Sequence, residues 1–408
     1  MNCRFCGKEL TKLFVSLGSA PLSNAYLKKE QLTKKEPSYP LDVYVCDGCF
    51  LVQLPEFESP ERIFSDYAYF SSYSETWVKH CEEYTDKMFK NYGIGKRSRV
   101  VEIASNDGCL LQHFIKRGMD VLGIEPAINV AEVARKKHVP TEVAFFGTRT
   151  ANRLLSEGKS ADLLIGNNVL AHVPELNDFV EGLKILLSPD GIITMEFPHL
   201  ARLIEGRQFD TIYHEHFSYF SFLTVNKIIS AHSLVIFDVE EISTHGGSLR
   251  IYARHKNGNP AAISERVGKM LDKEDELGFA DVKNYLAFDE QVKKVKRELL
   301  NFLDRIKQDG KTIVGYGAAA KGNTMLNYCG IKDDSIDYVA DISPHKQGRY
   351  LPGSRIPIAA PDRIRNTKPD YVLILPWNIK EEIMEQLSYI RDWGGKFVIP
   401  IPDLEVIR

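Results

Sequence analysis

The sequence predicts an α/β protein in which a small N-terminal zinc-binding module precedes two Rossmann-like domains. Two C-x-x-C pairs fall within the first 50 residues, and apolar runs alternate with helix-period segments twice, from residue 99 and again from residue 311. At 408 residues the chain is also longer than one core usually supports. We expect four parts: a zinc-binding module (1–70), a first α/β domain (71–257), a connecting helical segment (258–305) and a second α/β domain (306–408).

The composition is that of an ordinary globular protein, with 44% hydrophobic and 26% charged residues and a formal net charge of −3. This charge gives no long-range attraction to nucleic acid or to anionic lipid. The N-terminus lacks an apolar targeting segment, and no window reaches the ~18 consecutive apolar residues of a membrane span. We therefore expect a cytoplasmic protein with no nucleic-acid or membrane partner, and nothing in the sequence requires more than a monomer.

Four of the seven cysteines form the pairs Cys3/Cys6 and Cys46/Cys49. Two residues between thiolates let a tight turn direct both sulfurs at one ion, and two such pairs complete a closed tetrahedral zinc site. A thioredoxin-like redox pair or inert thiols are the alternatives. A catalytic zinc is disfavoured because four thiolates leave no open position. The other three cysteines are expected to be isolated core residues: Cys81, Cys109 and Cys329.

The first alternating set follows a helix-period segment at 74–92. Strand-like apolar runs lie at 99–104, 120–125, 162–166 and 191–197, and helical patterns follow the first two at 109–117 and 130–137. Strands that alternate with helices predict a parallel sheet with right-handed crossovers. A mixed segment at 234–252 is expected to pair at the sheet edge.

A candidate cofactor site lies where the first two strands end. Glu102 and Gly108 bracket the loop E-I-A-S-N-D-G, and Glu125 ends the next strand, where a carboxylate can accept both hydroxyl hydrogens of a ribose. A pyrophosphate favours G-x-G-x-x-G, whereas the sulfonium of S-adenosylmethionine favours acidic and carbonyl groups. The loop therefore indicates S-adenosylmethionine, with an ordinary strand-to-helix turn as the alternative.

The third strand ends in N-N-V-L-A-H-V, where methyltransferase folds position groups beside the reactive methyl. This second loop strengthens the interpretation of the first. The expected cofactor-binding residues are Glu102, Ala104, Asn106, Gly108, Glu125 and Asn167.

Four consecutive ionisable or hydroxyl side chains, Tyr213 to His216, fall in one short stretch. Methylation of a carbon requires a base and an oxyanion stabiliser, because the carbon must first become nucleophilic. His216 has the side-chain type to remove a proton near neutral pH, and Glu215, Tyr213 or His172 could donate to the enolate oxygen. An extended backbone would place Tyr213 and Glu215 on one face, whereas a turn would let Glu215 and His216 converge. A structural hydrogen-bonded cluster or a chance metal pair is the alternative.

The second alternating set has strand-like runs at 311–317, 335–341, 370–375 and 396–400. Gly315 and Gly317 end its first strand, Lys321 opens the next helix and Asp341 ends the next strand. Helix N-terminal amides and a lysine suit a diphosphate, and the aspartate suits a ribose. Without a third glycine the pattern favours NAD only weakly.

Together these motifs are similar to those of a known family, the carbon-methyltransferases of deoxysugar biosynthesis, which methylate carbon 3 of nucleotide-linked 4-keto sugars. The resemblance covers the C-x-x-C pairs, E-I-A-S-N-D-G, N-N-V-L-A-H-V, Y-H-E-H-F-S-Y and G-Y-G-A-A-A-K-G-N. Ala104 departs from it, because these enzymes usually carry glycine there.

The resemblance implies an S-adenosylmethionine-dependent enzyme with structural zinc that acts on a nucleotide-diphosphate keto-sugar. His216 is then the base and Glu215 assists keto–enol tautomerisation, with Tyr213 and His172 beside the sugar and His214 as an orienting residue. Tyr67 is expected to fold over the site. The implied substrate-binding residues are Tyr67, Lys321, Asn323, Asp341, Ile342, Trp377 and Asn378.

Two other functions are weighed against this one. An NAD-dependent sugar oxidoreductase would use the Gly315 loop, and nicotinamide absorbance changes would reveal it. A non-catalytic zinc-dependent scaffold would bind neither S-adenosylmethionine nor nucleotide. The sequence leaves open the nucleotide base and the substituents of the sugar.

Overall fold

The computed structural model describes residues 1–64, 70–258 and 262–408. The chain forms two compact units that interleave along the sequence. The first unit comprises Met1–Leu10, Cys46–His199 and Phe217–Asp281, and the second comprises Thr11–Val45, Leu200–His216 and Val282–Arg408. The linear boundaries after residues 70, 257 and 305 stay a prediction.

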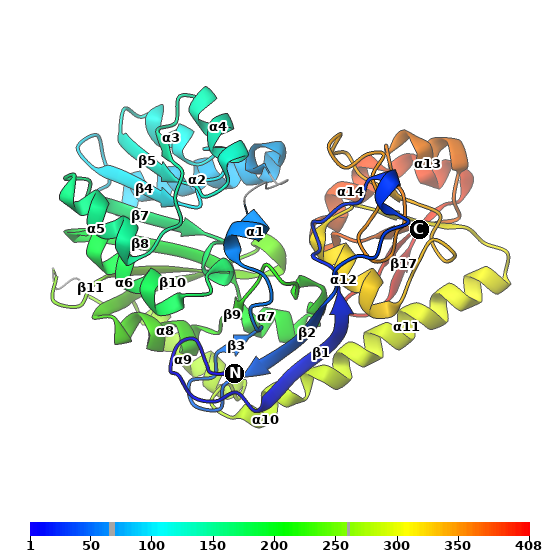
Figure 1. Cartoon of the computed structure of the whole chain (residues 1–408), viewed down its shortest axis with the longest axis horizontal. Helices are drawn as coiled ribbons and strands as arrows, with labels where there is room; N and C mark the ends of the chain where they lie inside the picture. Colours follow the sequence, from blue (N-terminus) through cyan, green and yellow to red (C-terminus); the bar gives the residue numbers. More distant parts are fainter. Residues whose placement is uncertain (65–69, 259–261) are drawn as a thin grey trace. The chain divides into compact units, whose positions relative to one another are not determined.

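A seven-stranded sheet forms the centre of the first unit, in the order β10-β11-β8-β7-β4-β5-β6 (Figure 1). β4 to β8 are parallel, whereas β11 is antiparallel to both of its neighbours. The strands in chain order are β4 (Arg99–Ile103), β5 (Asp120–Ile124), β6 (Thr141–Glu142), β7 (Ala161–Asn167), β8 (Leu187–Pro198), β10 (Leu234–Ile242) and β11 (Ser248–His255). The four expected parallel strands are confirmed, and the mixed segment 234–252 is a hairpin whose second strand lies inside the sheet rather than at its edge.

Helices cover this sheet and bury its apolar side chains. Ser74 caps α2 by accepting from the Trp77 N–H, and the helix buries Tyr84 and Met88 in the same core cluster as Phe114. The helices of the first unit are α1 (Pro60–Phe64), α2 (Glu75–Asn91), α3 (Leu111–Ile115), α4 (Ile128–Lys136), α5 (Thr148–Ser156), α6 (Leu176–Leu186), α8 (Phe222–Ala231) and α9 (Glu265–Glu276). A two-stranded pair, β3 (Val52–Gln53) with β9 (Ser218–Tyr219), completes it.

The second unit contains a six-stranded sheet in the order β14-β13-β12-β15-β16-β17. Its first five strands are parallel and β17 is antiparallel to β16. The strands are β12 (Ile313–Tyr316), β13 (Val339–Ala340), β14 (Ile358–Ala359), β15 (Tyr371–Ile374), β16 (Lys396–Ile399) and β17 (Glu405–Ile407). The helices are α7 (Leu200–Glu205), α10 (Val282–Leu286), α11 (Phe288–Gln308), α12 (Ala320–Cys329), α13 (Asp362–Thr367) and α14 (Lys380–Gln386).

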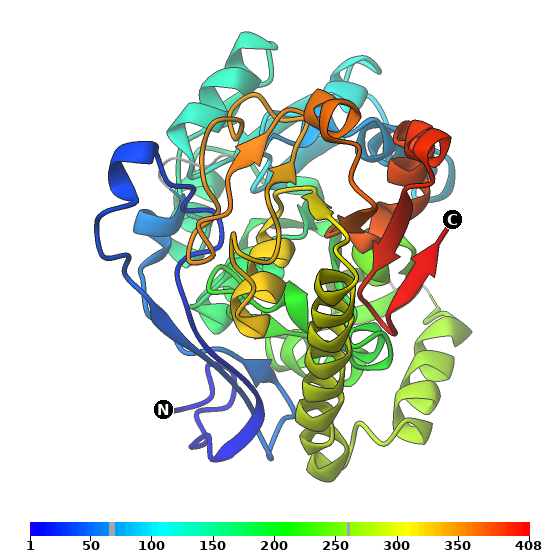
Figure 2. The ribbon, with the colours of Figure 1, turned by 90° about the vertical axis from the view of Figure 1, so that its right-hand side faces the viewer.

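The expected connecting segment 258–305 is several helices rather than one, because α9 belongs to the first unit while α10 and α11 belong to the second. α11 buries one stripe that includes Val292, Val295, Leu299 and Phe302, the i, i+3, i+4 pattern of an amphipathic helix. Phe302 packs edge-on against Tyr371 of β15, and Figure 2 shows α11, in yellow, next to the sheet of this unit.

An antiparallel hairpin, β1 (Lys12–Ala20) with β2 (Tyr39–Val45), also belongs to the second unit. Phe14 stacks on Phe288 of α11 with ring centroids 4.7 Å apart, and Tyr285 meets Phe14 edge-on. The predicted zinc-binding module therefore divides between the units. Strands β1 and β2 pack in the second unit, whereas the four cysteines belong to the first.

The described residues include no helix that is both long and apolar enough to span a membrane.

Candidate active site

The four predicted zinc ligands lie together in the first unit. The Sγ atoms of Cys3 and Cys49 are 3.5 Å apart, as are those of Cys6 and Cys46, and all four lie within 4.8 Å of one another. Tetrahedral Zn–S bonds of ~2.3 Å place sulfurs about 3.8 Å apart, so the cluster fits a closed zinc site. Gln53 donates from Nε2 to the Cys3 Sγ (3.2 Å), which orients that ligand. It is the only metal-ligand cluster found among the described residues.

The loop after β4 requires left-handed backbone at three positions. The φ angle is 53° at Ala104, 49° at Asn106 and 76° at Gly108. Glycine and asparagine adopt this region readily, whereas the alanine Cβ makes it cost roughly 1–2 kcal/mol. A Cβ at Gly108 would also lie 2.7 Å from the Val139 Cγ2, so that position needs glycine for space as well.

Glu125 braces this loop from the end of β5. Its Oε2 accepts from the Asn106 N–H and its Oε1 from the Ala127 N–H, both at 2.9 Å. Only 5% of Glu125 is exposed, and burial raises the pKa of its carboxyl. Each carboxylate oxygen has two lone pairs, so Glu125 can hold the loop and still accept from a ribose.

Several buried oxygens around the loop have no hydrogen-bond partner among the described residues. They include Oε2 of Glu102 and the Oδ1 atoms of Asn167 and Asn168. Burial, together with nearby Cys109 and Glu125, raises the pKa of Glu102 well above its usual range. An unsatisfied buried acceptor costs about 1–3 kcal/mol, so a ligand rich in donors would be favoured. The ammonium and ribose hydroxyls of S-adenosylmethionine are such donors, and the residues fit that cofactor.

The loop is also tied to the segment just before α2. The Ser71 N–H donates to Oδ1 of Asn106 (2.8 Å), and Lys137 Nζ bridges Oδ2 of Asp107 and Oγ of Ser72 (2.8 Å each). The expected lid residue Tyr67 lies outside the described residues.

Cys81 and Cys109 are buried core residues, as the sequence predicted, and they belong to the same core cluster. Their thiols share a hydrogen bond, which lowers the pKa of Cys109 and, together with burial, raises that of Cys81. Residues 28 positions apart on a helix and a loop carry no local sequence signal for such a pair.

In the second unit, residues Tyr213 to His216 form a turn. The His216 N–H donates to the Tyr213 carbonyl (2.9 Å), and the two rings are in contact, with centroids 4.1 Å apart and planes tilted by 33°. The turn thus brings the His216 ring to the Tyr213 ring. The sequence had suggested that a turn could bring Glu215 and His216 together. His216 Nδ1 donates to the Thr211 carbonyl (2.8 Å), and this bond assigns the ring proton to Nδ1 and the lone pair of the neutral ring to Nε2.

Glu215 is 3% exposed, and burial raises the pKa of its carboxyl to about 7. Asn24, which sequence reasoning missed, donates from Nδ2 to both carboxyl oxygens at 2.7 and 2.9 Å. This bond favours the ionised form of Glu215, so it acts against the effect of burial on the pKa. No sequence pattern links positions 191 residues apart, so only the fold reveals Asn24.

The two remaining histidines of the prediction are His214, within the turn, and His172. His214 is buried against Tyr39 and bonds through Nε2 to the Pro40 carbonyl (3.1 Å), so it anchors the turn to β2. His172 ends a short 3-10 helix after β7, in the first unit. Its neighbour Ala171 accepts from the Phe217 N–H (2.7 Å).

The glycine loop after β12 brings the predicted nucleotide residues together. Gly317 has a φ of 88° and has Pro376 packed against it. Asp341 accepts from the Ala318 N–H through Oδ2 and from the Ser343 N–H through Oδ1, both at 2.8 Å. Asp341 therefore braces this loop as Glu125 braces the other.

Lys321 opens α12 beside two residues that follow β15. Its Nζ donates to Oδ1 of Asn378 (2.7 Å) and lies 4.7 Å from the Trp377 ring centroid. Trp377 in turn donates from Nε1 to Oδ2 of Asp210 (2.7 Å). Asp210 is fully buried, which raises its pKa to about 6, and it was not predicted as a site residue.

The last two predicted substrate residues differ in exposure. Ile342 is 64% exposed after β13, which suits an apolar contact with a nucleoside. Asn323 is 1% exposed and donates from Nδ2 to the Ser23 carbonyl (2.6 Å), so its amide is partly committed to the fold.

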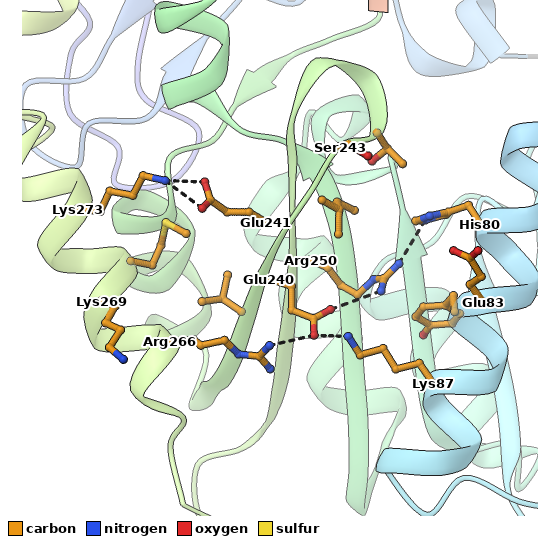
Figure 3. Close-up of a pocket in the computed structure, with 15 residues that line it drawn as sticks. His80, Glu83, Lys87, Glu240, Glu241, Ser243, Arg250, Arg266, Lys269 and Lys273 are labelled. Atoms are coloured by element: carbon orange, nitrogen blue, oxygen red, sulfur yellow. Dashed lines mark hydrogen bonds and ion pairs between the residues drawn. The ribbon is translucent and has the colours of Figure 1, made fainter. Parts of the chain in front are cut away.

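A cavity of about 870 Å³ in the first unit, which the sequence did not indicate, has a strongly charged lining (Figure 3). Glu240 accepts from Lys87 and from Arg266, and Lys273 pairs with Glu241 at 2.7 Å (Figure 3). Arg250 pairs with the buried Glu196 behind it. The cations are matched by carboxylates, so this network fixes α2 and α9 on the β10–β11 hairpin rather than attracting an anion.

The chain matches three family models that together cover most of its length. Residues 3–64 match the family model "Putative zinc binding domain", residues 74–235 match "Methyltransferase domain" and residues 243–402 match "C-methyltransferase C-terminal domain". The C-methyltransferase NovU of Streptomyces niveus is 36% identical over 410 residues, which cover 100% of this chain and 96% of that protein.

More distant similarities are confined to part of the chain. The ubiquinone biosynthesis O-methyltransferase of Bartonella tribocorum is 25% identical over 96 residues, 23% of this chain and 39% of that one. The crystal structure of the PH0226 protein from Pyrococcus horikoshii is 18% identical with a TM-score of 0.38, and covers 49% of this chain and 100% of that one.

The strand order and the acidic loop define an S-adenosylmethionine-dependent methyltransferase. The full-length similarity is more specific, and the chain belongs to the C-methyltransferase family. It is therefore an enzyme whose cofactors are S-adenosylmethionine and a structural zinc ion held by the four cysteines. The oxidoreductase and scaffold alternatives fall away.

The zinc site yields a stability prediction. Cys46→Ser, at a fully buried ligand position, should lower the zinc content measured by mass spectrometry from one ion per chain and lower the melting temperature. Cys329→Ser, a buried cysteine outside the cluster, is the control and should keep one zinc. Full zinc content in Cys46→Ser would contradict the assignment.

Ala104→Gly should stabilise the protein by up to about 1 kcal/mol, because glycine removes the Cβ strain at a φ of 53° while it costs some unfolded-state entropy. Ala151→Gly, inside α5, should instead destabilise by about 1 kcal/mol or more. Urea unfolding measures both, and a loss of stability in Ala104→Gly would refute the strain argument.

The buried Glu215 should make stability depend on pH. Because folding raises its pKa from 4.5 to about 7, its protonated form is favoured, and the stability it adds at low pH is lost as pH rises through 7. Glu215→Gln should remove that loss, a difference on the order of 2–3 kcal/mol between pH 5 and pH 8 in urea unfolding. The exposed Glu276→Gln is the control, and equal pH slopes in all three proteins would disprove the burial effect.

Proposed function

We propose that this C-methyltransferase methylates carbon 3 of a nucleotide-linked 4-keto-deoxysugar. The observation that carries the proposal is the turn at Tyr213–His216, which brings an imidazole against a phenol and fixes the imidazole tautomer. NovU, a similar protein over the full chain, is named as a C-methyltransferase. The sugar, its keto group and carbon 3 are what the resemblance to the carbon-methyltransferases of deoxysugar biosynthesis implies, and the side chains of the turn are of the types that this reaction needs.

His216 is the proposed base. With its Nδ1 proton donated to the Thr211 carbonyl, the lone pair at Nε2 can take the proton from the carbon next to the ketone. The Thr211 carbonyl then also stabilises the imidazolium that forms. This is the role that an acceptor behind a catalytic histidine plays generally.

Glu215 and Tyr213 are the proposed partners of the enolate oxygen. A carboxyl with a pKa of about 7 exists in both forms near neutral pH, so Glu215 can give and take the proton during keto–enol tautomerisation. The Tyr213 hydroxyl can donate to the same oxygen, and His172 is also proposed to contact the sugar. S-adenosylmethionine supplies the electrophilic methyl group to the carbon.

The glycine loop after β12 is proposed to hold the nucleotide diphosphate. Lys321 offers a cation near the N-terminus of α12, and Ile342 offers an exposed apolar surface to the nucleoside. Asp341, Asn323, Trp377 and Asn378 complete the proposed set, with Tyr67 as the proposed lid. Glu102, Ala104, Asn106, Gly108, Glu125 and Asn167 are the proposed cofactor residues.

Exchange of the substrate proton in deuterated water tests the base. The enzyme should exchange the hydrogen at the methylated carbon of a keto-sugar without a methyl donor, and His216→Asn should reduce the exchange by at least ~100-fold, because general-base catalysis contributes about 10²–10⁴. The control is His232→Asn, which changes a histidine at the C-terminal end of α8 in the first unit. Full exchange in His216→Asn would refute the assignment.

The substrate class is tested separately by mass spectrometry. Nucleotide-linked keto-sugars incubated with S-adenosylmethionine should gain one methyl, and the matching sugars without the 4-keto group should not. Methylation of the reduced sugars would contradict the enolate route.

A further inference from the structure

The segment between β1 and β2 contains a short stretch, Pro21–Leu27, that hydrogen bonds hold at two points within the second unit. The Ser23 carbonyl accepts from Nδ2 of Asn323 at 2.6 Å. Leu27 and Tyr350 exchange both backbone hydrogen bonds at 2.9 Å. The position of the residues between these anchors is therefore set by the fold of the unit.

Asn24 lies between the anchors and reaches Glu215. Its Nδ2 is 2.7 Å from one carboxyl oxygen and 2.9 Å from the other, so a single amide faces the middle of the carboxyl group. Burial raises the pKa of the Glu215 carboxyl, and the bond from this amide lowers it. The rotamer and ionisation of Glu215 are therefore influenced by a side chain from another part of the sequence.

Tyr26 contacts the side chain of Asn24. Its hydroxyl donates to the Ala318 carbonyl at 2.6 Å and lies 3.4 Å from Oδ1 of Asn24. The same carbonyl accepts from Lys346 Nζ at 2.9 Å. Tyr26 is 8% exposed and its pKa is raised by burial and by the charges of Asp341 and Glu215, so it faces Glu215 as a neutral phenol near pH 7.

We propose that Asn24 is a positioning residue for this enzyme, which orients the Glu215 carboxyl and sets its proton affinity, with Tyr26 holding the amide in place. The role of Glu215 in tautomerisation rests on the proposed function, but the effect of Asn24 on Glu215 does not. Asn24 acts through Glu215 and Tyr26 acts through Asn24. A merely structural asparagine would change stability without changing the titration of Glu215.

The test follows the protonation of Glu215 directly in the whole protein. Infrared spectra recorded from pH 5 to pH 9 contain a carbonyl band of the protonated carboxyl, assigned as the band that Glu215→Gln lacks. Asn24→Leu removes the donor at similar volume and should move the midpoint upward by about one to two pH units. Asn24→Asp should raise it at least as far, because a second carboxylate opposes ionisation.

Two further variants separate positioning from folding. Asn24→Gln retains an amide donor and should restore part of the shift, and Tyr26→Phe should raise the midpoint by less than Asn24→Leu does. Asn301→Leu, at an exposed asparagine of α11 in the same unit, should leave the midpoint unchanged. An unchanged midpoint in Asn24→Leu overturns the proposal, as does a midpoint in Asn24→Gln equal to that in Asn24→Leu.

Catalysis supplies the second readout. In methyl transfer to a keto-sugar, Asn24→Leu should lower kcat about 3- to 30-fold with little change in KM and move the pH profile of kcat in the same direction as the infrared midpoint. An unmoved pH profile with a moved midpoint would overturn the link to the reaction. If no keto-sugar is methylated by the unaltered protein, the proposed function fails, while the infrared midpoints still decide the role of Asn24.

Discussion

Burial of carboxyl groups against backbone N–H donors is the constraint on which both candidate loops depend. Glu125 holds the loop after β4 through the amides of Asn106 and Ala127, and Asp341 holds the loop after β12 through those of Ala318 and Ser343. Each carboxylate offsets its desolvation with two charge-assisted bonds and keeps lone pairs for a ligand. The two units thus use the same device to shape the turn that follows a parallel strand.

Two other buried carboxyls have pKa values closer to neutral pH. Glu215 has the Asn24 amide and Asp210 has the Trp377 indole, and burial raises their pKa to about 7 and about 6. Such groups are unfavourable for stability above those pH values, because the folded state resists their ionisation. A site that must move protons near neutral pH benefits from that balance, whereas a purely structural contact does not.

The sequence predicted what local patterns encode. Alternating apolar runs predicted four of the five parallel strands in each sheet and missed the two-residue strands β6 and β14, and the C-x-x-C spacing predicted the four cysteines that come together. The sequence could not predict pairs of residues that lie far apart along the chain. No periodic or spacing signal marks three such pairs: Asn24 with Glu215, Cys81 with Cys109, and Trp377 with Asp210. The turn that brings Tyr213 against His216 was also undetermined, because an extended strand and a turn fit the same four residues.

Contacts within the second unit fix the candidate catalytic turn, which lies outside regular secondary structure. Within the second unit, the Ile212 carbonyl accepts from Thr324 and His214 bonds to Pro40. A short segment with so many fixed points loses little further entropy when a substrate binds, so the cost of orienting the base is met in folding rather than in catalysis.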